Sequence, residues 1–261
     1  MDFSRLTKIL SLSMIFTGRR ILYTLYRPKV KLLLVDLDGT LLQNHSTLED
    51  GLILIFKEKK GKKIYNDLMS LISNEKKTPE QIMILAEEYL KQGKFTKTHL
   101  EKINATMLAQ IDKSLLTTLQ QIKKAQIIIA TKSSHTLAKN IANKYDFLGG
   151  IGTDLKFNSQ GLFIDTKVLV ANKNKSLYNH IFRTKLALAK KMYSEKFGPI
   201  KNKNIGILTD SYADINIMTS VGLAIYLKPI TPDAAQRICD KFRLFDKKVT
   251  KSNLSKIIEI V

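Results

Sequence analysis

The chain has 261 residues, of which 44% are hydrophobic and 25% are charged, a composition that excludes both wholesale disorder and a protein with several membrane spans. Its one cysteine, Cys239, excludes an internal disulfide framework and a cysteine-based zinc site, and favours a reducing, cytoplasmic location. The 43 Lys and Arg residues outnumber the 23 Asp and Glu residues to give a net charge of +20, which attracts anionic partners such as phosphorylated molecules, nucleic acid or an anionic membrane.

Residues 1–30 form a basic N-terminal segment around an uncharged stretch at 9–18. This stretch is too short to cross a bilayer, which requires about 20 apolar residues. Two interpretations of the segment remain open. One is a basic helix that makes peripheral contact with an anionic membrane surface. The other, which we favour, is a helix packed on the domain before its first strand.

Three continuous apolar runs predict buried strands, because each run ends in a polar cluster. They lie at residues 32–35, 126–130 and 204–208, and a further strand is expected at 223–227. Helical patterns follow the second and third runs, at 137–145 and 215–220. Repeated strand–helix units predict an α/β fold with a doubly wound (Rossmann-like) parallel sheet, in which ligands bind beyond the carboxyl ends of the strands.

The long stretch between the first and second runs carries helical patterns and almost no strand pattern. It predicts a small helical cap over residues 44–120. The cap is inserted into a core that consists of residues 31–43 and 121–261. Within this core, residues 152–157 and 161–166 predict a β-hairpin.

The strongest motif is Asp36-Leu37-Asp38-Gly39-Thr40, directly after the first predicted strand. Alternate residues of an extended chain point the same way, so Asp36 and Asp38 present two carboxylates to one place. Paired carboxylates are unfavourable without a cation. Mg²⁺ accepts a few carboxylates while retaining water and phosphate ligands, so the motif predicts a Mg²⁺ site at the edge of the sheet.

A second acidic pair, Asp210 and Asp214, follows the third predicted strand. Because parallel strands end at the same edge of a sheet, this pair can approach Asp36 and Asp38. Four converging carboxylates strengthen the prediction of a metal ion. Taken alone, Asp210 and Asp214 would serve equally well as the acidic first turn of a helix.

This arrangement resembles the haloacid dehalogenase (HAD) superfamily of phosphatases. Asp36-x-Asp38-Gly39-Thr40 matches the first motif of the superfamily, Thr131 matches the second, and Asp210-x-x-x-Asp214 matches the fourth. The helical insert between the first two motifs and the later hairpin are similar to the phosphoserine-phosphatase-like branch. The resemblance covers about residues 31–245.

The resemblance implies a Mg²⁺-dependent phosphatase that hydrolyses a phosphorylated small molecule, a phosphoric monoester, in two steps. Asp36 would be the nucleophile that forms an aspartyl phosphate, and Asp38 would act as acid and then as base. Thr131 would hydrogen-bond the phosphoryl group. The Mg²⁺ ligands would be Asp36, the backbone carbonyl of Asp38, and Asp210, with Asp214 ordering the groups around the ion.

The third motif of the superfamily is a lysine, and helical periodicity selects Lys185 for this role. Apolar residues between 177 and 193 form one broad face of a predicted helix. Lys185 lies within this face, whereas Lys190 and Lys191 lie opposite. A lysine on a buried face needs a partner, which the acidic motifs would provide, and Lys185 would also bind phosphate. The alternative is that Lys185 extends to solvent from the edge of the face.

Three departures from the family pattern limit the resemblance. Thr209 stands where glycine is frequent, and Lys132 where a small residue is common. The predicted cap contains no arginine, although phosphoserine phosphatases hold the substrate carboxylate with one, so we do not favour phosphoserine as the substrate.

Two other functions remain open. One is a phosphotransferase or mutase on the same scaffold. The other is a catalytically inactive basic protein that binds a membrane or nucleic acid, and the intact motif set argues against it. We do not expect nucleic acid as a partner, and the sequence leaves the oligomeric state open.

Overall fold

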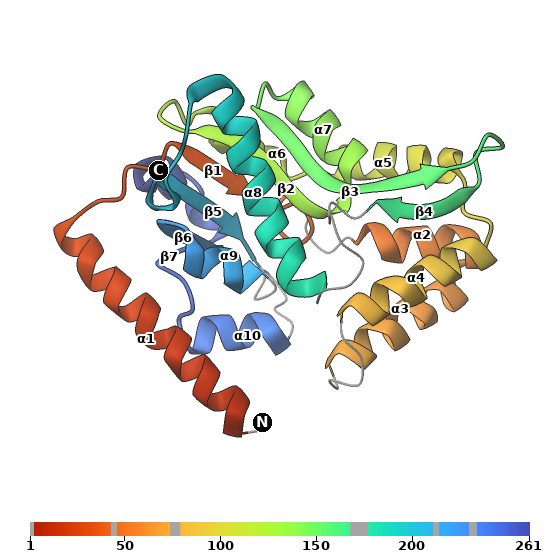
Figure 1. Ribbon diagram of the computed structural model, residues 1–261, viewed down its shortest axis with the longest axis horizontal. Helices are drawn as coiled ribbons and strands as arrows, with labels where there is room; N and C mark the ends of the chain where they lie inside the picture. The colour runs from red at the N-terminus through yellow and green to blue at the C-terminus, as the bar shows by residue number, and fades with distance from the viewer. Residues whose placement is uncertain (1–2, 43–45, 74–78, 168–176, 211–213, 230–233) are drawn as a thin grey trace.

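The computed structural model describes residues 3–42, 46–73, 79–167, 177–210, 214–229 and 234–261. Over these residues the chain forms one sheet that is covered by helices on both faces (Figure 1). The strand order is β4-β3-β2-β1-β5-β6-β7, and every neighbouring pair is parallel except β3 and β4. The strands are β1 Leu32–Val35, β2 Gln126–Ser134, β3 Gly149–Phe157, β4 Phe163–Lys167, β5 Ile205–Thr209, β6 Leu223–Leu227 and β7 Lys247–Val249. The predicted α/β fold is confirmed.

β1 lies at the centre of the sheet because both of its faces are apolar. All four of its residues are buried. Leu33 lies opposite Ile127 of β2 and Gly206 of β5. Successive side chains of a strand point to opposite faces, so Leu33 and Val35 pack in one hydrophobic cluster, whereas Leu32 and Leu34 pack in another. One short strand therefore joins the two halves of the core.

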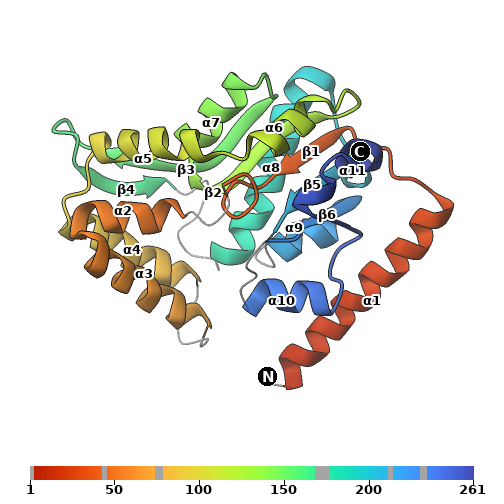
Figure 2. The ribbon, with the colours of Figure 1, turned by 180° about the vertical axis from the view of Figure 1, so that it is seen from behind.

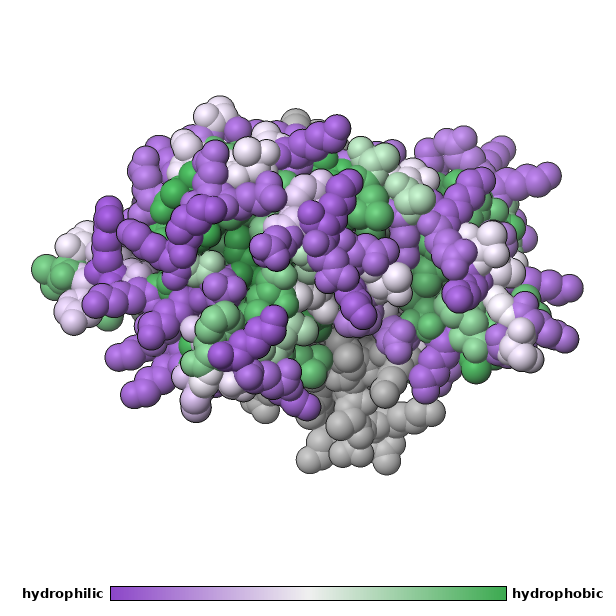
Figure 3. Space-filling view, turned by 90° about the horizontal axis from the view of Figure 1, so that it is seen from above, coloured by the Kyte–Doolittle hydropathy of each residue, from purple (hydrophilic) through white to green (hydrophobic). Residues whose placement is uncertain are grey.

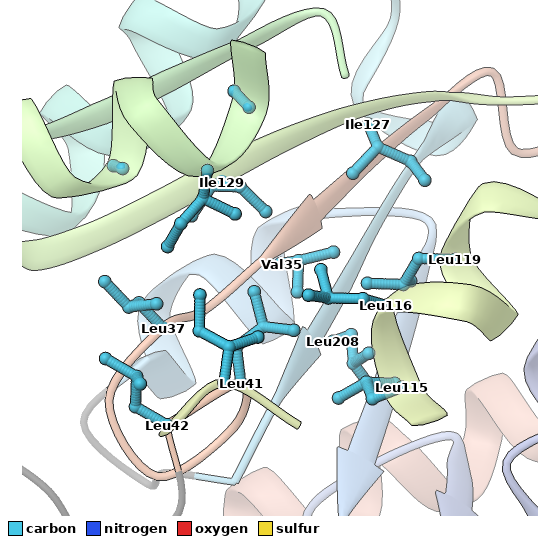
Figure 4. Packing of buried hydrophobic residues seen from close by; sticks show 14 of the residues in the cluster. Val35, Leu37, Leu41, Leu42, Leu115, Leu116, Leu119, Ile127, Ile129 and Leu208 are labelled. Atoms are coloured by element: carbon cyan, nitrogen blue, oxygen red, sulfur yellow. The ribbon is translucent and has the colours of Figure 1, made fainter. Parts of the chain in front are cut away.

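The face of the sheet with Leu33 and Val35 is covered by four helices. These are α5 Lys97–Gln110, α6 Lys113–Gln120, α7 His135–Lys144 and α11 Lys256–Ile260. Figure 4 shows Val35 and Leu208 of the sheet beside the leucines of α6. α6 begins after Asp112, whose carboxylate accepts hydrogen bonds from the backbone N–H groups of Ser114 and Leu115. These hydrogen bonds satisfy backbone N–H groups of the first turn and fix the start of α6.

The opposite face of the sheet is covered by α1 Phe3–Leu25, α8 Leu177–Phe197, α9 Ile215–Ser220 and α10 Ala234–Lys241. Leu32 and Leu34 of β1 pack against this layer, together with Tyr226 of β6. The surface of the molecule, in contrast to these two apolar clusters, is rich in polar side chains. Hydrophilic side chains extend over much of the face of the molecule that Figure 3 shows.

Helices α2 Thr47–Phe56, α3 Glu58–Ser73 and α4 Pro79–Gln92 have a hydrophobic cluster of their own. They lie at the end of the molecule opposite α1 (Figures 1 and 2). α5 and α6 do not share this cluster and instead contribute Met107 and Leu116 to the cluster of the sheet. α2 nevertheless contacts α3, α4 and α5, and the division of the chain into a core and a cap over residues 44–120 stays a prediction. Helical periodicity reveals an apolar face, but not which surface covers that face.

The predicted hairpin is present, but its first strand begins earlier than expected. β3 pairs with β2 in parallel through Gly149, Gly150 and Ile151, and then with β4 in the antiparallel direction. The two glycines conceal the strand pattern. A Cβ atom at Gly150 would overlap the backbone of Ala138 in α7, so glycine allows α7 to approach the sheet closely.

The N-terminal segment forms α1, and one face of this helix packs on the domain. Ile9 is 1% exposed and Phe16 is 0% exposed. Arg19 Nη2 lies 2.5 Å from Asp246 Oδ2, and Arg19 Nη1 donates to the carbonyl oxygen of Met218 at 2.7 Å. The packing interpretation of this segment is therefore confirmed. Within the described ranges, no helix combines the length and the hydropathy needed to cross a membrane.

The substitution Phe16→Ala should lower the free energy of unfolding by about 3 to 5 kcal/mol, because it removes a large side chain from a fully buried position. Met14, which is 69% exposed on the same helix, provides the control. Met14→Ala should change the free energy by less than about 0.5 kcal/mol. Urea denaturation of both variants measures the difference, and equal effects would contradict the packing of α1.

Candidate active site

Asp36 and Asp38 lie where β1 ends, at the carboxyl edge of the sheet. The backbone N–H of Asp36 donates to the carbonyl oxygen of Leu208 at 2.9 Å, which continues the pairing between β1 and β5. Asp36 is 8% exposed. The strand therefore fixes the first carboxylate by its own backbone hydrogen bonds.

The turn that follows is held by hydrogen bonds and by buried leucines. The N–H of Gly39 donates to the carbonyl oxygen of Leu42, and the N–H of Leu42 donates to that of Leu37, both at 2.8 Å. Leu37 and Leu42 are fully buried. Gly39 has a φ of 77°, a conformation that favours glycine, and a Cβ there would overlap the Asp210 carboxylate. Glycine thus allows the two acidic motifs to meet.

Each carboxylate of the second acidic pair is held by a threonine hydroxyl. Thr40 Oγ1 donates to Asp210 Oδ1 at 3.1 Å and accepts a hydrogen bond from the N–H of Asp210 at 3.1 Å. Thr209 Oγ1 donates to Asp214 Oδ2 at 3.1 Å. Asp214 immediately precedes α9, but its side chain makes no capping hydrogen bond with this helix. Its contacts are therefore directed to the site rather than to the helix start.

Lys185 of α8 lies between two of the carboxylates. Its Nζ is 3.3 Å from Asp36 Oδ1 and 3.3 Å from Asp214 Oδ1, and the residue is 4% exposed. Burial alone would lower the pKa of Lys185, but Asp214 and Asp36 raise it above its ordinary value. Lys190 contacts Asn202 instead, and Lys191 is exposed. The structure thus brings the lysine selected by periodicity to the acidic motifs.

Thr131 lies at the same edge of the sheet, in β2. Its Oγ1 donates to Asp38 Oδ2 at 3.2 Å, and the hydroxyl of Ser133 also donates to this oxygen. The N–H of Ser133 donates to Thr131 Oγ1 at 2.9 Å. The other carboxylate oxygen, Asp38 Oδ1, is buried and makes no hydrogen bond with the described residues. Two hydroxyls therefore orient Asp38 while one of its oxygens stays unbonded.

The buried carboxylates carry strongly shifted pKa values. Burial raises the pKa of Asp36 to about 7, although Lys185 opposes the shift. Burial and the neighbouring Asp36 raise the pKa of Asp210 to about 8. Burial also raises the pKa of Asp38, and the hydroxyls of Ser133 and Thr131 lower it only in part. Burial therefore disfavours the ionised form of these carboxyl groups more than the neighbouring lysine and hydroxyl groups favour it.

These residues fit a divalent cation near Asp36 and Asp210, because burial raises the pKa of both carboxyl groups and an additional positive charge would favour their ionised forms. No three His, Cys, Asp or Glu side chains in the described part of the chain converge as a metal site. A Mg²⁺ ion held here therefore needs an oxygen ligand from another group. The expected backbone carbonyl of Asp38 is such a group, whereas the Asp38 side chain contacts Thr131 and Ser133.

A cavity of about 500 Å³ lies over these carboxylates, between the sheet edge and the helices α2–α4. Asp36, Asp38, Lys132, Lys185, Asp210 and Asp214 line it from the sheet side. Tyr65 of α3 and Ala86, Glu87 and Leu90 of α4 line it from the other side. The hydroxyl of Thr166 in β4 donates to Glu87 across one wall. The positive side chains in the lining are lysines, and no arginine is present among the described residues that form it.

The structure adds the side chains of four further residues to the site, and no role was assigned to them from the sequence. Thr40, Thr209 and Ser133 hydrogen-bond the acidic side chains, and Lys132 lines the cavity. Each lies within two residues of an acidic motif or of Thr131. Their proximity along the chain was a usable signal, but hydroxyl residues are too frequent in this sequence for that signal to be specific.

No known family model matches the chain, and no curated protein matches it in sequence. Its structure does match solved structures. A HAD family hydrolase from Salmonella enterica serovar Typhi has a TM-score of 0.65 and 14% identity over 90% of this chain and 75% of the other. A phosphoserine phosphatase, solved as a phospho-aspartyl intermediate analogue, has a TM-score of 0.64 and 17% identity over 89% of this chain and 99% of the other.

A third match is a phosphoserine phosphohydrolase-like protein from Francisella tularensis, with a TM-score of 0.63 and 14% identity over 89% of this chain and 100% of the other. The TM-scores show that these proteins share the fold of this chain. At identities this low, the comparison shows the fold alone. The chain has the fold of the HAD-family hydrolases of the phosphoserine-phosphatase-like kind, as its motifs predicted.

The substitution Asp210→Asn should stabilise the metal-free protein at alkaline pH. The folded-state pKa of Asp210 is about 8 against an ordinary value of 3.8, so the folded state holds this proton more tightly than the unfolded chain does. The wild-type protein therefore loses stability as the pH rises through this interval. The Asn variant does not ionise, and it keeps the Oδ1 acceptor for Thr40.

At about pH 9 we expect the variant to exceed the wild type by on the order of 2 to 5 kcal/mol, and the two to converge at about pH 4. Chemical denaturation with a chelator present, repeated across this range, measures the difference. Parallel pH profiles for the two proteins would contradict the raised pKa.

Proposed function

We propose that this chain is a Mg²⁺-dependent phosphatase, which hydrolyses a phosphoric monoester through an aspartyl-phosphate intermediate. One observation carries the proposal. A buried Asp36, paired with Lys185 at 3.3 Å, stands two residues before an oriented Asp38 in the cavity of a HAD-like fold. The fold alone supports only a hydrolase of this general type, and the arrangement of these three side chains supports the phosphatase chemistry.

Asp36 is the proposed nucleophile. Lys185 contacts its Oδ1 and favours the ionised form, which is the form that attacks phosphorus. The Asp36 oxygen forms a bond to phosphorus while the bond from phosphorus to the leaving oxygen breaks. Water then attacks the aspartyl phosphate, and inorganic phosphate leaves. Covalent catalysis of this kind replaces one slow displacement by two faster steps.

Asp38 is the proposed acid and base. Its raised pKa favours the protonated form, which can donate a proton to the leaving oxygen in the first step. The resulting carboxylate can accept a proton from the attacking water in the second. Thr131 and Ser133 bind Oδ2, so we assign the proton transfer to Oδ1, the oxygen that is buried without a hydrogen-bond partner among the described residues.

Asp36, the backbone carbonyl of Asp38 and Asp210 are the proposed ligands of Mg²⁺, which when bound would neutralise charge on the phosphoryl oxygens. Asp214 orders this arrangement through Lys185 and Thr209. We assign phosphate binding to Lys185 and to the hydroxyl of Thr131, whose single hydrogen would then turn from Asp38 Oδ2 to the phosphoryl group and leave Ser133 to orient Asp38.

The proposed substrate is a phosphorylated small molecule other than phosphoserine. A substrate-bound complex is known for a structurally similar phosphoserine phosphatase. In the present chain, however, the cavity wall formed by α3 and α4 presents Tyr65, Ala86, Glu87 and Leu90. Three of these four side chains have no charge and the fourth is negative, so this wall supports a leaving group without a carboxylate.

Asp36→Asn should abolish Mg²⁺-dependent hydrolysis of p-nitrophenyl phosphate, because a neutral amide cannot form the aspartyl phosphate. Release of nitrophenol, with and without Mg²⁺, provides the measurement. Asp67→Asn is the matched control, since Asp67 is exposed and paired with Lys63 on the surface of α3. Turnover retained by the Asp36 variant, with an unchanged melting temperature, would rule out the nucleophile assignment.

Asp38→Asn should lower the hydrolysis rate by about 10²-fold to 10⁴-fold, because both proton transfers would lose their catalyst. The loss should be larger for an alkyl phosphate than for p-nitrophenyl phosphate, whose leaving group needs less protonation. Parallel assays of inorganic phosphate release compare the two substrates. An equal loss for both would exclude Asp38 as the acid.

A further inference from the structure

The outer face of α1 carries an unusual concentration of exposed apolar side chains. Of the ten large hydrophobic residues that are exposed in the described structure, seven lie in or next to this helix. Leu10, Met14, Ile21 and Leu25 follow the helical repeat along one side, and they are 47%, 69%, 61% and 80% exposed. Single exposed apolar residues are ordinary, but four along one side of the same helix, interrupted only at Thr17 and Gly18, indicate a surface that contacts another molecule.

The opposite face of α1 fixes the rotation of the helix, so these side chains cannot turn inward. The Arg19 guanidinium is bound to Asp246 and to the carbonyl oxygen of Met218. Arg20 Nη1 donates to the carbonyl oxygens of Arg243 and Phe245 at 2.8 and 2.7 Å. Both arginines thus serve as anchors. The outer face, which we define as Leu10, Met14, Ile21 and Leu25, remains directed away from the domain.

The surroundings of the outer face are basic. α1 contains no Asp or Glu. On one side, exposed Lys241 and Arg243 line a shallow groove together with Ile21. Farther along the helix, Lys247, Lys248 and Lys256 line a second groove with Arg27 and one carboxylate, Glu259. A neighbouring carboxylate, Asp240, is paired with Lys248. Positive side chains therefore predominate in both grooves beside α1.

We propose that the outer face of α1 docks the protein on an anionic lipid bilayer. A helix with an exposed apolar row and basic flanks is suited to lie in the plane of the interface, where its apolar side chains enter the lipid and its cations meet the headgroups. A second copy of this chain is a poorer occupant, because the same basic flanks would face each other. The helices α2–α4 beside the candidate active site lie at the far end of the molecule (Figures 1 and 2).

Flotation of the full chain with vesicles tests this proposal and requires no catalytic activity. Vesicles of phosphatidylcholine mixed with phosphatidylserine should bind the protein, and those of phosphatidylcholine alone should bind it less. Raising the salt concentration should weaken binding, since it screens the basic flanks. The double variant Met14→Ser/Leu25→Ser should bind the mixed vesicles about tenfold or more weakly, because two exposed apolar side chains no longer enter the lipid.

Ile84→Ser/Ile164→Ser is the matched control, since both side chains are exposed, by 57% and 46%, on α4 and β4. This pair should bind as the wild type does. Equal weakening by both pairs, or absence of binding to the mixed vesicles, would overturn the proposal. So would binding that the Met14→Ser/Leu25→Ser variant retains in full, since charge elsewhere would then explain it.

The same variants also test whether a second copy of the chain, rather than a bilayer, covers the outer face of α1. If the wild type forms a dimer without lipid and Met14→Ser/Leu25→Ser converts it to a monomer, the outer face is a contact between copies and the membrane proposal is wrong. Unchanged hydrolysis of a soluble phosphate ester by both variants would separate this outcome from any failure of the proposed phosphatase activity.

Discussion

The contact of the Lys185 ammonium with Asp36 and Asp214 is the interaction on which the candidate site depends. Nζ lies 3.3 Å from one oxygen of each carboxylate. The three groups come from the end of β1, from α8 and from the residue before α9, so a single buried cation connects three elements that are distant in the sequence. Without it, the two buried carboxylates would lose a compensating charge, which is costly in the protein interior. The hydroxyls of Thr40, Thr209 and Ser133 act on the acidic side chains in another way. They orient the carboxylates of Asp210, Asp214 and Asp38 without adding positive charge.

Hydrophobic patterning made most of the core predictable. The strands at 32–35 and 223–227 and the helix at 215–220 were predicted with the bounds that the structure has, because each is a short apolar segment with polar residues at its ends. Lys185 was selected because a charged residue within an apolar helical face is rare and needs a partner. The acidic motifs were recognised because each directly follows a buried strand.

The start of β3, the strand β7, the partners of two helices and one hydrogen bond of the site could not be predicted, because none of them produces a local pattern in the sequence. β3 begins with two glycines, which carry no apolar side chain, and β7 contains two exposed lysines. The packing of α5 and α6 against the sheet depends on which apolar faces meet, and periodicity contains no information about partners. The hydrogen bond between Thr40 and Asp210 joins residues 170 positions apart, so only the folded chain reveals it.

The anchoring of α1 has a consequence for the order in which the protein is built. Phe16 and Arg19 belong to the first helix, yet Asp246, the ion-pair partner of Arg19, lies 227 positions later. A ribosome therefore releases α1 long before it has made the surface that covers this helix, and closing so long a loop is slow. Throughout that interval both apolar faces of α1 are uncovered, and transiently exposed hydrophobic surface of this kind favours aggregation until β6, α10 and β7 have emerged.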